Sequence, residues 1–139
     1  MWQGNYQTTC DVPAEDLYRI ICDVANWPEW DAGLIYTRVK GVPVAGMEFV
    51  LKPKGGPDVK MRIDEMQPCR LVDTAFLLGA QMRTIHEYIP CGAQTLIRMR
   101  VEVRGPMSFF WRKIVAEDQI KQAPQQMQAF IRYALAQSA

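Results

Sequence analysis

The stretch from Pro13 to Asp31 constrains the fold most, because it predicts two helices of different length joined by a break. Pro13 suits the first position of a helix, where its missing N–H group would have no partner in any case. The apolar side chains that follow are spaced three and four residues apart, which requires one buried helix face; they are Leu17, Ile20, Ile21 and Val24. Asn26 can cap a second, shorter helix with Trp27 and Trp30 on one side. Such a helix pair needs a surface on which to pack.

Strand-like segments on both sides of the helices predict that surface. Residues Thr95–Arg104 give the clearest pattern, because apolar side chains alternate with mostly charged ones, as in a strand with one dry and one solvated face. Glycine and proline predict tight turns at Pro53–Pro57, Gly79–Ala80 and Cys91–Gly92. The seven predicted strands are Trp2–Cys10, Leu34–Lys40, Met47–Lys52, Val59–Met66, Leu71–Leu77, Met82–Ile89 and Thr95–Arg104.

A long helix is predicted after Gly105 and Pro106, which end the last strand. Its apolar stripe is wide enough to cover a sheet and consists of Met127, Phe130, Ile131, Ala134 and Leu135. Pro124 removes one hydrogen bond inside this helix, so we expect a kink or a restart near residues 122–124.

Composition and charge limit the classes of function. With 139 residues, 49% hydrophobic and 22% charged, the chain is expected to form one domain over residues 1–139. Its net charge of +1 lacks the basic excess of nucleic-acid-binding proteins. Without a membrane-spanning apolar run or a signal peptide, we expect a cytoplasmic protein with no stable membrane insertion. The four cysteines are too widely spaced for a zinc knuckle, so we expect reduced thiols, no metal and no cofactor.

Four short motifs carry a resemblance to a known family; they are Val12-Pro13-Ala14-Glu15, Asp23 to Trp30, Pro90 to Thr95, and Gly105-Pro106. In this order, the chain resembles the START-like helix-grip superfamily (SRPBCC), and within it the polyketide cyclase/dehydrase and lipid-transport-like group. The resemblance implies an α+β helix-grip fold. A curved seven-stranded antiparallel sheet, two short helices after the first strand and a long C-terminal helix would enclose a cavity for an apolar or amphipathic molecule. It implies no single reaction, since members include lipid carriers, aromatase/cyclases and chaperone-ATPase activators.

Strand parity and hairpin register predict which side chains face that cavity. A turn about Gly79–Ala80 places Asp73 opposite His86. A turn about Cys91–Gly92 then places His86 opposite Ile97, which lies on the dry face of the last strand. A three-residue turn in the first hairpin would instead send Asp73 to the outer face.

His86 and Asp73 are the candidate catalytic residues. His86 is the only histidine, and a carboxylate opposite it would fix its tautomer and raise its basicity. Such a pair could enolise or dehydrate a bound polyketide while Tyr88 or Thr84 holds a carbonyl. The alternative is that the pair only satisfies its own hydrogen bonds or binds one end of a ligand, as most buried polar groups do.

The candidate ligand-binding residues are Tyr88, Thr84, Met82, Thr95, Ile97, Met99, Val101, Met61, Phe49, Trp30 and Phe110. The methionines suit an adaptable pocket, although methionine is also ordinary core filler. Trp30 could form the rim of the cavity or seal the core. The aromatic run Phe109–Trp111 could gate the entrance, or could form a dimer contact or a membrane-touching patch.

Three hypotheses of function remain open. The first is binding of a small hydrophobic or amphipathic ligand, such as a lipid, a quinone or a polyketide-like aromatic, by a monomer or homodimer. The second is an aromatase/cyclase or dehydratase that uses His86 with Asp73. The third is a protein-interaction module resembling the chaperone-ATPase activators, which an interior filled by the protein's own side chains would favour.

Overall fold

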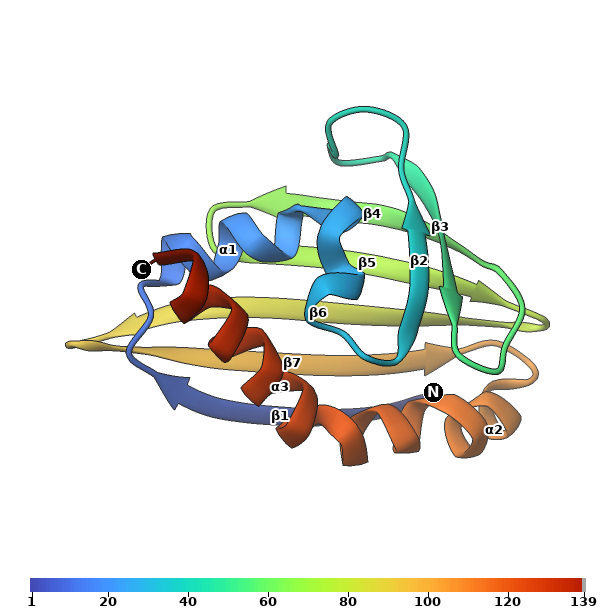
Figure 1. Ribbon diagram of the computed structural model, residues 1–139. Helices are drawn as coiled ribbons and strands as arrows, with labels where there is room; N and C mark the ends of the chain where they lie inside the picture. The colour runs from blue at the N-terminus through green and yellow to red at the C-terminus, as the bar shows by residue number, and fades with distance from the viewer. Residues whose placement is uncertain (139) are drawn as a thin grey trace.

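A single seven-stranded sheet organises the molecule, as the computed structural model of residues 1–138 shows (Figure 1). The strands pair antiparallel in the order β1-β7-β6-β5-β4-β3-β2. They are β1 (Trp2–Cys10), β2 (Leu34–Arg38), β3 (Glu48–Pro53), β4 (Val59–Gln67), β5 (Arg70–Leu77), β6 (Ala80–Cys91) and β7 (Gln94–Arg104). Seven antiparallel strands in this chain order confirm the predicted sheet.

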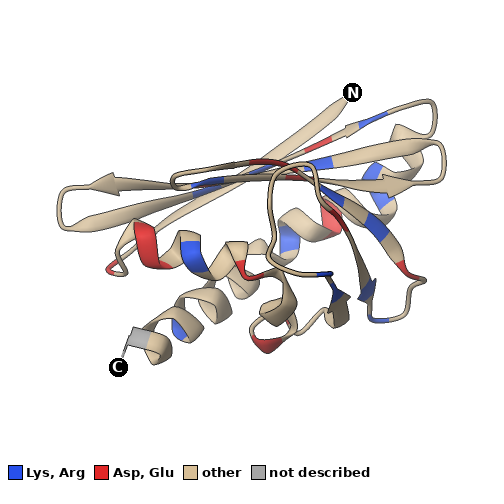
Figure 2. Ribbon diagram, turned by 90° about the horizontal axis from the view of Figure 1, so that it is seen from above, with Lys and Arg blue, Asp and Glu red and all other residues tan. Residues whose placement is uncertain are grey.

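The helical segments lie on one side of the sheet, as the view along its edge shows (Figure 2). They are α1 (Ala14–Cys22), the 3₁₀ helix η1 (Val24–Glu29), α2 (Ser108–Trp111), the π-helical turn η2 (Arg112–Ala116) and α3 (Glu117–Ser138). Two short helices after β1 and a long helix at the C-terminus confirm the predicted helix-grip arrangement. Among the described residues, no helix is both long and apolar enough to cross a membrane.

The helix pair after β1 buries the face that its spacing predicts. Leu17, Ile20, Ile21 and Val24 are all at most 9% exposed. The prediction that Asn26 caps the second helix is wrong: Asp23 occupies the cap position of η1, and the Asn26 side chain donates to the Asp23 carboxylate from within the helix. Trp27 instead fixes the helix pair, because its indole N–H donates to the carbonyl of Ile21 at 2.8 Å.

The C-terminal helical segment is irregular just before α3 begins, and it is regular at Pro124. Helix α3 continues through Pro124 without a restart, and the irregular turn is η2, upstream of it. The residues that α3 buries are Ala123, Met127, Phe130 and Ala134. Leu135 is 52% exposed, so the buried stripe is narrower than predicted.

The predicted register of both C-terminal hairpins is wrong by two residues. Leu77 pairs with Ala80, and Cys91 pairs with Gln94, so each turn lies one residue away from its predicted place. Gly79 takes the second position of the first turn with a φ of +70°, a conformation that glycine adopts without strain. Because side chains alternate with a period of two, the error leaves every residue on its predicted face.

Candidate functional site

The face of the sheet that meets the helices, called the inner face below, is apolar except for one group of polar side chains. Neighbouring strands bring their residues together in rows. One row contains Ile63, Asp73, Thr84 and Val101, and the next contains Met66, Leu71, His86 and Met99. Tyr88 lies further along β6, opposite Ile97. Asp73, Thr84, His86 and Tyr88 therefore form the polar group of the inner face.

His86 and Asp73 are in contact. Nε2 of His86 lies 3.3 Å from Oδ2 of Asp73, and the two side chains are 15% and 4% exposed. The sequence predicts that the two residues are directly opposite, but Asp73 lies opposite Thr84, and His86 lies opposite Leu71. The contact is therefore diagonal, a spacing that long side chains can bridge.

Tyr88 supplies a buried hydroxyl on the inner face. Burial, and to a smaller extent Cys22 and Asp73, raises the pKa of this hydroxyl well above its usual range, so it remains a hydrogen-bond donor. Its ring stacks on Phe130 of α3 with the ring centres 6.0 Å apart.

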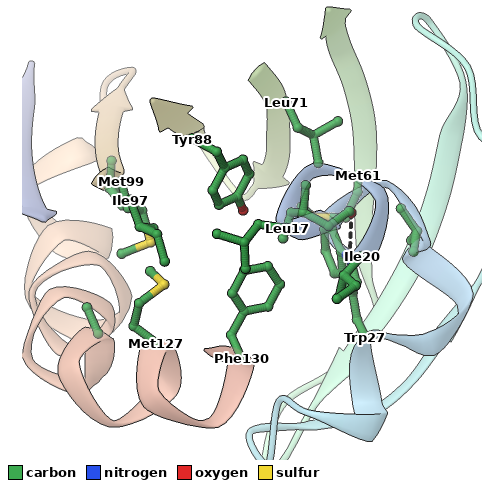
Figure 3. Packing of buried hydrophobic residues seen from close by; sticks show 14 of the residues in the cluster. Leu17, Ile20, Trp27, Met61, Leu71, Tyr88, Ile97, Met99, Met127 and Phe130 are labelled. Carbon is green, nitrogen blue, oxygen red and sulfur yellow. Dashed lines mark hydrogen bonds between the residues drawn. The ribbon is translucent and has the colours of Figure 1, made fainter. Parts of the chain in front are cut away.

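Phe130 of α3 points toward Tyr88 (Figure 3) and belongs to an aromatic cluster. Phe130 contacts Trp30 with a ring-centre separation of 4.7 Å, and Trp27 contacts Phe49 at 5.6 Å. The indole N–H of Trp30 is buried without a hydrogen-bond partner in the described chain. The sequence gives no indication that Phe130 belongs to the site; its helical spacing predicts burial, but not the strand that it meets.

The other predicted ligand-binding residues divide into two groups. The buried ones are Met61, Met82, Thr95, Ile97, Met99, Val101 and Phe49. Of these, Thr95 is already engaged, because its hydroxyl donates to the carbonyl of Val12 at 2.6 Å. Phe110 does not join them: it is 40% exposed on α2 and packs edge-on against Trp111.

The space between the inner face and α3 is occupied by side chains. Figure 3 shows Tyr88 above Phe130, and Met99 above Met127. Each of these residues is at most 8% exposed. A ligand can occupy this space only if some of these side chains move, and methionine, with three rotatable bonds, is the residue type best suited to that.

A hollow of about 410 Å³ opens beside the helix pair, between the end of α1 and the loop that joins β2 to β3. Its apolar walls consist of Cys22, Ala25, Val39, Val42, Pro43 and Met66, and Arg19, Asp23 and Gly41 complete the lining. Met66 pairs with Leu71, and Leu71 pairs with His86. Met66 of the hollow therefore lies two strands away from His86 and one strand away from Asp73.

The opposite, outer face of the sheet carries ion pairs. Arg98 lies 3.1 Å from Glu87, and Arg100 lies 3.5 Å from Glu102. A polar hollow of about 240 Å³ on this face is lined by Arg62, Asp64, Thr74, Gln81, Arg83, Glu102 and Arg104. Within the described chain, no group of three or more histidine, cysteine or acidic side chains is placed to hold a metal ion.

Solved structures show which proteins share this fold. A START superfamily protein from Mycobacterium smegmatis has a TM-score of 0.75 at 12% identity, with 94% of this chain and 97% of that chain covered. Norcoclaurine synthase from Thalictrum flavum, in complex with dopamine and hydroxybenzaldehyde, has a TM-score of 0.74 at 15% identity, with 97% and 87% covered. The di-domain ARO/CYC protein BexL from the BE-7585A biosynthetic pathway has a TM-score of 0.72 at 18% identity, with 94% and 45% covered. At such identities the likeness concerns the fold alone.

The sequence comparison places the chain in a family. No curated protein shows a significant match to it. Residues 1–133, however, match the family described as polyketide cyclase / dehydrase and lipid transport. This match covers nearly the whole chain and agrees with the START-like neighbours, which confirms the resemblance seen in the sequence. The protein belongs to the polyketide cyclase / dehydrase and lipid transport family.

Proposed function

We propose that the protein binds a small hydrophobic or amphipathic ligand between the inner face and α3. The observation that carries this proposal is the indole N–H of Trp30, which is buried without a hydrogen-bond partner among the described residues and belongs to a ring that packs against Phe130. A buried donor without a partner costs about 1–3 kcal/mol. A ligand oxygen that accepts from Trp30 would remove this cost, while the rest of the ligand gains from apolar burial.

The aromatic residues favour a ring-bearing ligand over a flexible acyl chain. Tyr88, Phe130 and Trp30 present ring faces and edges to one another, and an inserted ring could take up the same contacts. Aromatic pairs contribute about 0.5–1.5 kcal/mol beyond the burial of their area. Among the classes that the sequence suggests, a quinone or a polyketide-like aromatic with a carbonyl oxygen therefore fits better than a lipid.

The hollow beside α1 is the proposed opening. The loop that borders it carries Gly41 and Gly46 with φ values of +84° and +89°, and exposes 81% of Val42. Met66 lines the hollow and also belongs to the inner-face row that contains Leu71 and His86. We propose that the ligand enters when Met66 changes rotamer, a motion that leaves the sheet intact.

Binding can be tested by titrating the protein with menadione, a naphthoquinone, and in parallel with oleate, while the tryptophan fluorescence is followed. We expect saturable quenching by menadione and about fivefold weaker binding by Trp30→Phe, since one neutral hydrogen bond contributes about 1 kcal/mol. The matched control is Trp111→Phe, which also removes one tryptophan, because the Trp111 indole donates to the carbonyl of Leu78 outside the site. If neither probe binds, the ligand-binding proposal fails, and a protein-interaction module becomes the better reading of the packed interior.

The contact between His86 and Asp73 supports a second candidate, proton transfer to or from the bound ligand. If the Nε2 proton is donated to Asp73, Nδ1 of His86 remains a free base. It could remove a proton from the carbon beside a ketone, with the enolate oxygen held by the Tyr88 hydroxyl. The role of Asp73 would be to orient the imidazole.

Hydrogen–deuterium exchange at the α-carbon of an aromatic 1,3-diketone, followed by NMR, tests this second candidate. We expect the protein to accelerate the exchange, and His86→Gln to abolish the acceleration while the diketone still quenches tryptophan fluorescence. Equal exchange rates with the wild-type protein and with His86→Gln would refute proton transfer and leave the binding proposal untouched.

A further inference from the structure

The β5–β6 turn and α2 lie at the same end of the molecule (Figure 1), and they and η2 carry large exposed apolar side chains. Leu78, in the turn, is 80% exposed, and Phe109, Phe110 and Ile114 are 67%, 40% and 54% exposed. We call these four residues the apolar corner. Neither the core nor the candidate site uses them. Exposed apolar side chains gathered in one place mark surfaces that contact a partner or a membrane.

The apolar corner is held together by hydrogen bonds between its two parts. The indole N–H of Trp111 donates to the carbonyl of Leu78 at 2.7 Å, and the amide of Met107 donates to the carbonyl of Gly79 at 2.9 Å. At Gly105, a Cβ atom would lie 2.7 Å from that same Gly79 oxygen, so only glycine permits this approach. The turn and α2 therefore present one surface of fixed geometry.

The segment that carries most of the apolar corner is basic. Residues 104–116 contain Arg104, Arg112 and Lys113 and no acidic residue, although the whole chain has a net charge of only +1. Arg112 and Lys113 are exposed beside the apolar corner. The first carboxylate after them is Glu117, which lies 3.3 Å from Arg112. Apolar side chains bordered by cations have the chemistry of a surface that binds anionic lipid headgroups.

We propose that the apolar corner docks on the surface of a membrane that contains anionic lipid. Phe109, Phe110 and Leu78 would enter the headgroup region, while Arg112 and Lys113 contact lipid phosphates. A second copy of the chain fits this surface less well, since a two-fold contact sets each patch against itself and would bring these cations together. The inference goes beyond the proposed function and does not rest on it.

Co-sedimentation with vesicles tests the docking. The probes are vesicles of pure phosphatidylcholine and vesicles with three parts in ten of phosphatidylglycerol. We expect binding to the anionic vesicles only, and its loss at 0.5 M salt, where screening acts within about 4 Å. Lys113→Gln should weaken binding about fivefold, the factor that corresponds to about 1 kcal/mol per cation near an anionic leaflet. Leu78→Ser with Phe109→Ser should weaken it at least tenfold.

The matched controls are Val44→Ser and Leu135→Ser, which remove exposed apolar side chains elsewhere, 55% and 52% exposed. Both should bind as the wild-type protein does, and unchanged circular dichroism and melting temperature show that all variants fold. The proposal is overturned if anionic vesicles do not bind the protein, or if the controls weaken binding as much as Phe109→Ser does. It is also overturned if Phe109→Ser dissociates a dimer in sedimentation velocity without affecting vesicle binding.

Discussion

On the outer face of the sheet, the Glu87 carboxylate lies between two cations, 2.8 Å from Arg70 and 3.1 Å from Arg98. On the inner face, the side chain of Asp73 contacts His86 at 3.3 Å and is only 4% exposed. Water reaches the outer pairs and supports them when one partner is lost, so such pairs contribute little to stability. The inner pair has no such support. The comparison indicates that solvent supports the outer charges, whereas the inner pair depends on its two members and, under the proposed function, on a bound ligand.

The largest expected difference between the faces concerns aromatic residues. Phe130→Ala removes a ring that is 1% exposed and contacts both Trp30 and Tyr88, and should lower the free energy of unfolding by about 3–5 kcal/mol. The matched change on the outer face is Phe76→Ala, where Arg62 lies over the ring at 5.1 Å. It should cost about 1 kcal/mol, because such exposed contacts are weak. Urea denaturation measures the free energy of unfolding of both variants. Equal decreases would mean that aromatic residues on the two faces contribute equally to stability.

The next largest effect concerns the inner polar pair. His86→Leu leaves the Asp73 carboxylate buried without its partner and should lower the free energy of unfolding by about 3 kcal/mol. Adding Asp73→Leu to this variant should recover most of the lost stability, because replacing both members of a buried pair with apolar side chains costs little. Glu87→Gln, the outer-face control, should change stability by less than about 1 kcal/mol. A double variant less stable than His86→Leu would show that the pair stabilises the fold.

The sequence predicts which face of the sheet a residue occupies better than it predicts which residue of the neighbouring strand it contacts. Alternation in β7 identifies Met99 as inner and Arg98 as outer, because the period of a strand is two residues whatever its partner. Which residues face each other across a hairpin depends on the position of its turn. The turn between β5 and β6 places Gly79 at a φ of +70°, and the alternation of apolar and polar residues does not predict this position. The two-residue error in register preserved the faces, so the contact between His86 and Asp73 survived as a diagonal one.

The helical side of the site was harder to predict for a related reason. The spacing of Met127 and Phe130 predicts that both are buried, but helical periodicity carries no information about the strand that a helix crosses. The stacking of Phe130 on Tyr88 depends on where η2 turns the chain, and no sequence pattern marks that π-helical turn. Pro124, the one visible signal of irregularity, lies in a continuous helix.

The smallest predicted effect concerns Asp31, whose carboxylate accepts from neutral donors, whereas the Glu87 carboxylate on the outer face pairs with arginines. Asp31, after η1, accepts from the amide of Gly33 at 2.9 Å and from the side chain of Gln126 at 2.6 Å. Burial raises the pKa of this carboxyl, and the two hydrogen bonds offset part of the rise. The folded state therefore holds the proton to a higher pH than the unfolded chain does.

The raised pKa of Asp31 determines how the free energy of unfolding changes with pH. As the pH rises from the usual aspartate value of about 4 through the raised value, the unfolded chain loses its proton first, and the free energy of unfolding falls. Asp31→Asn has no such titration, so its stability relative to the wild-type protein should increase across this window, as urea denaturation at stepped pH values would show. Gln126→Met removes a donor that lowers the pKa and should make the decline steeper. A wild-type protein that gains stability over Asp31→Asn as the pH rises would mean that these two neutral donors stabilise the charged carboxylate as effectively as arginines stabilise Glu87.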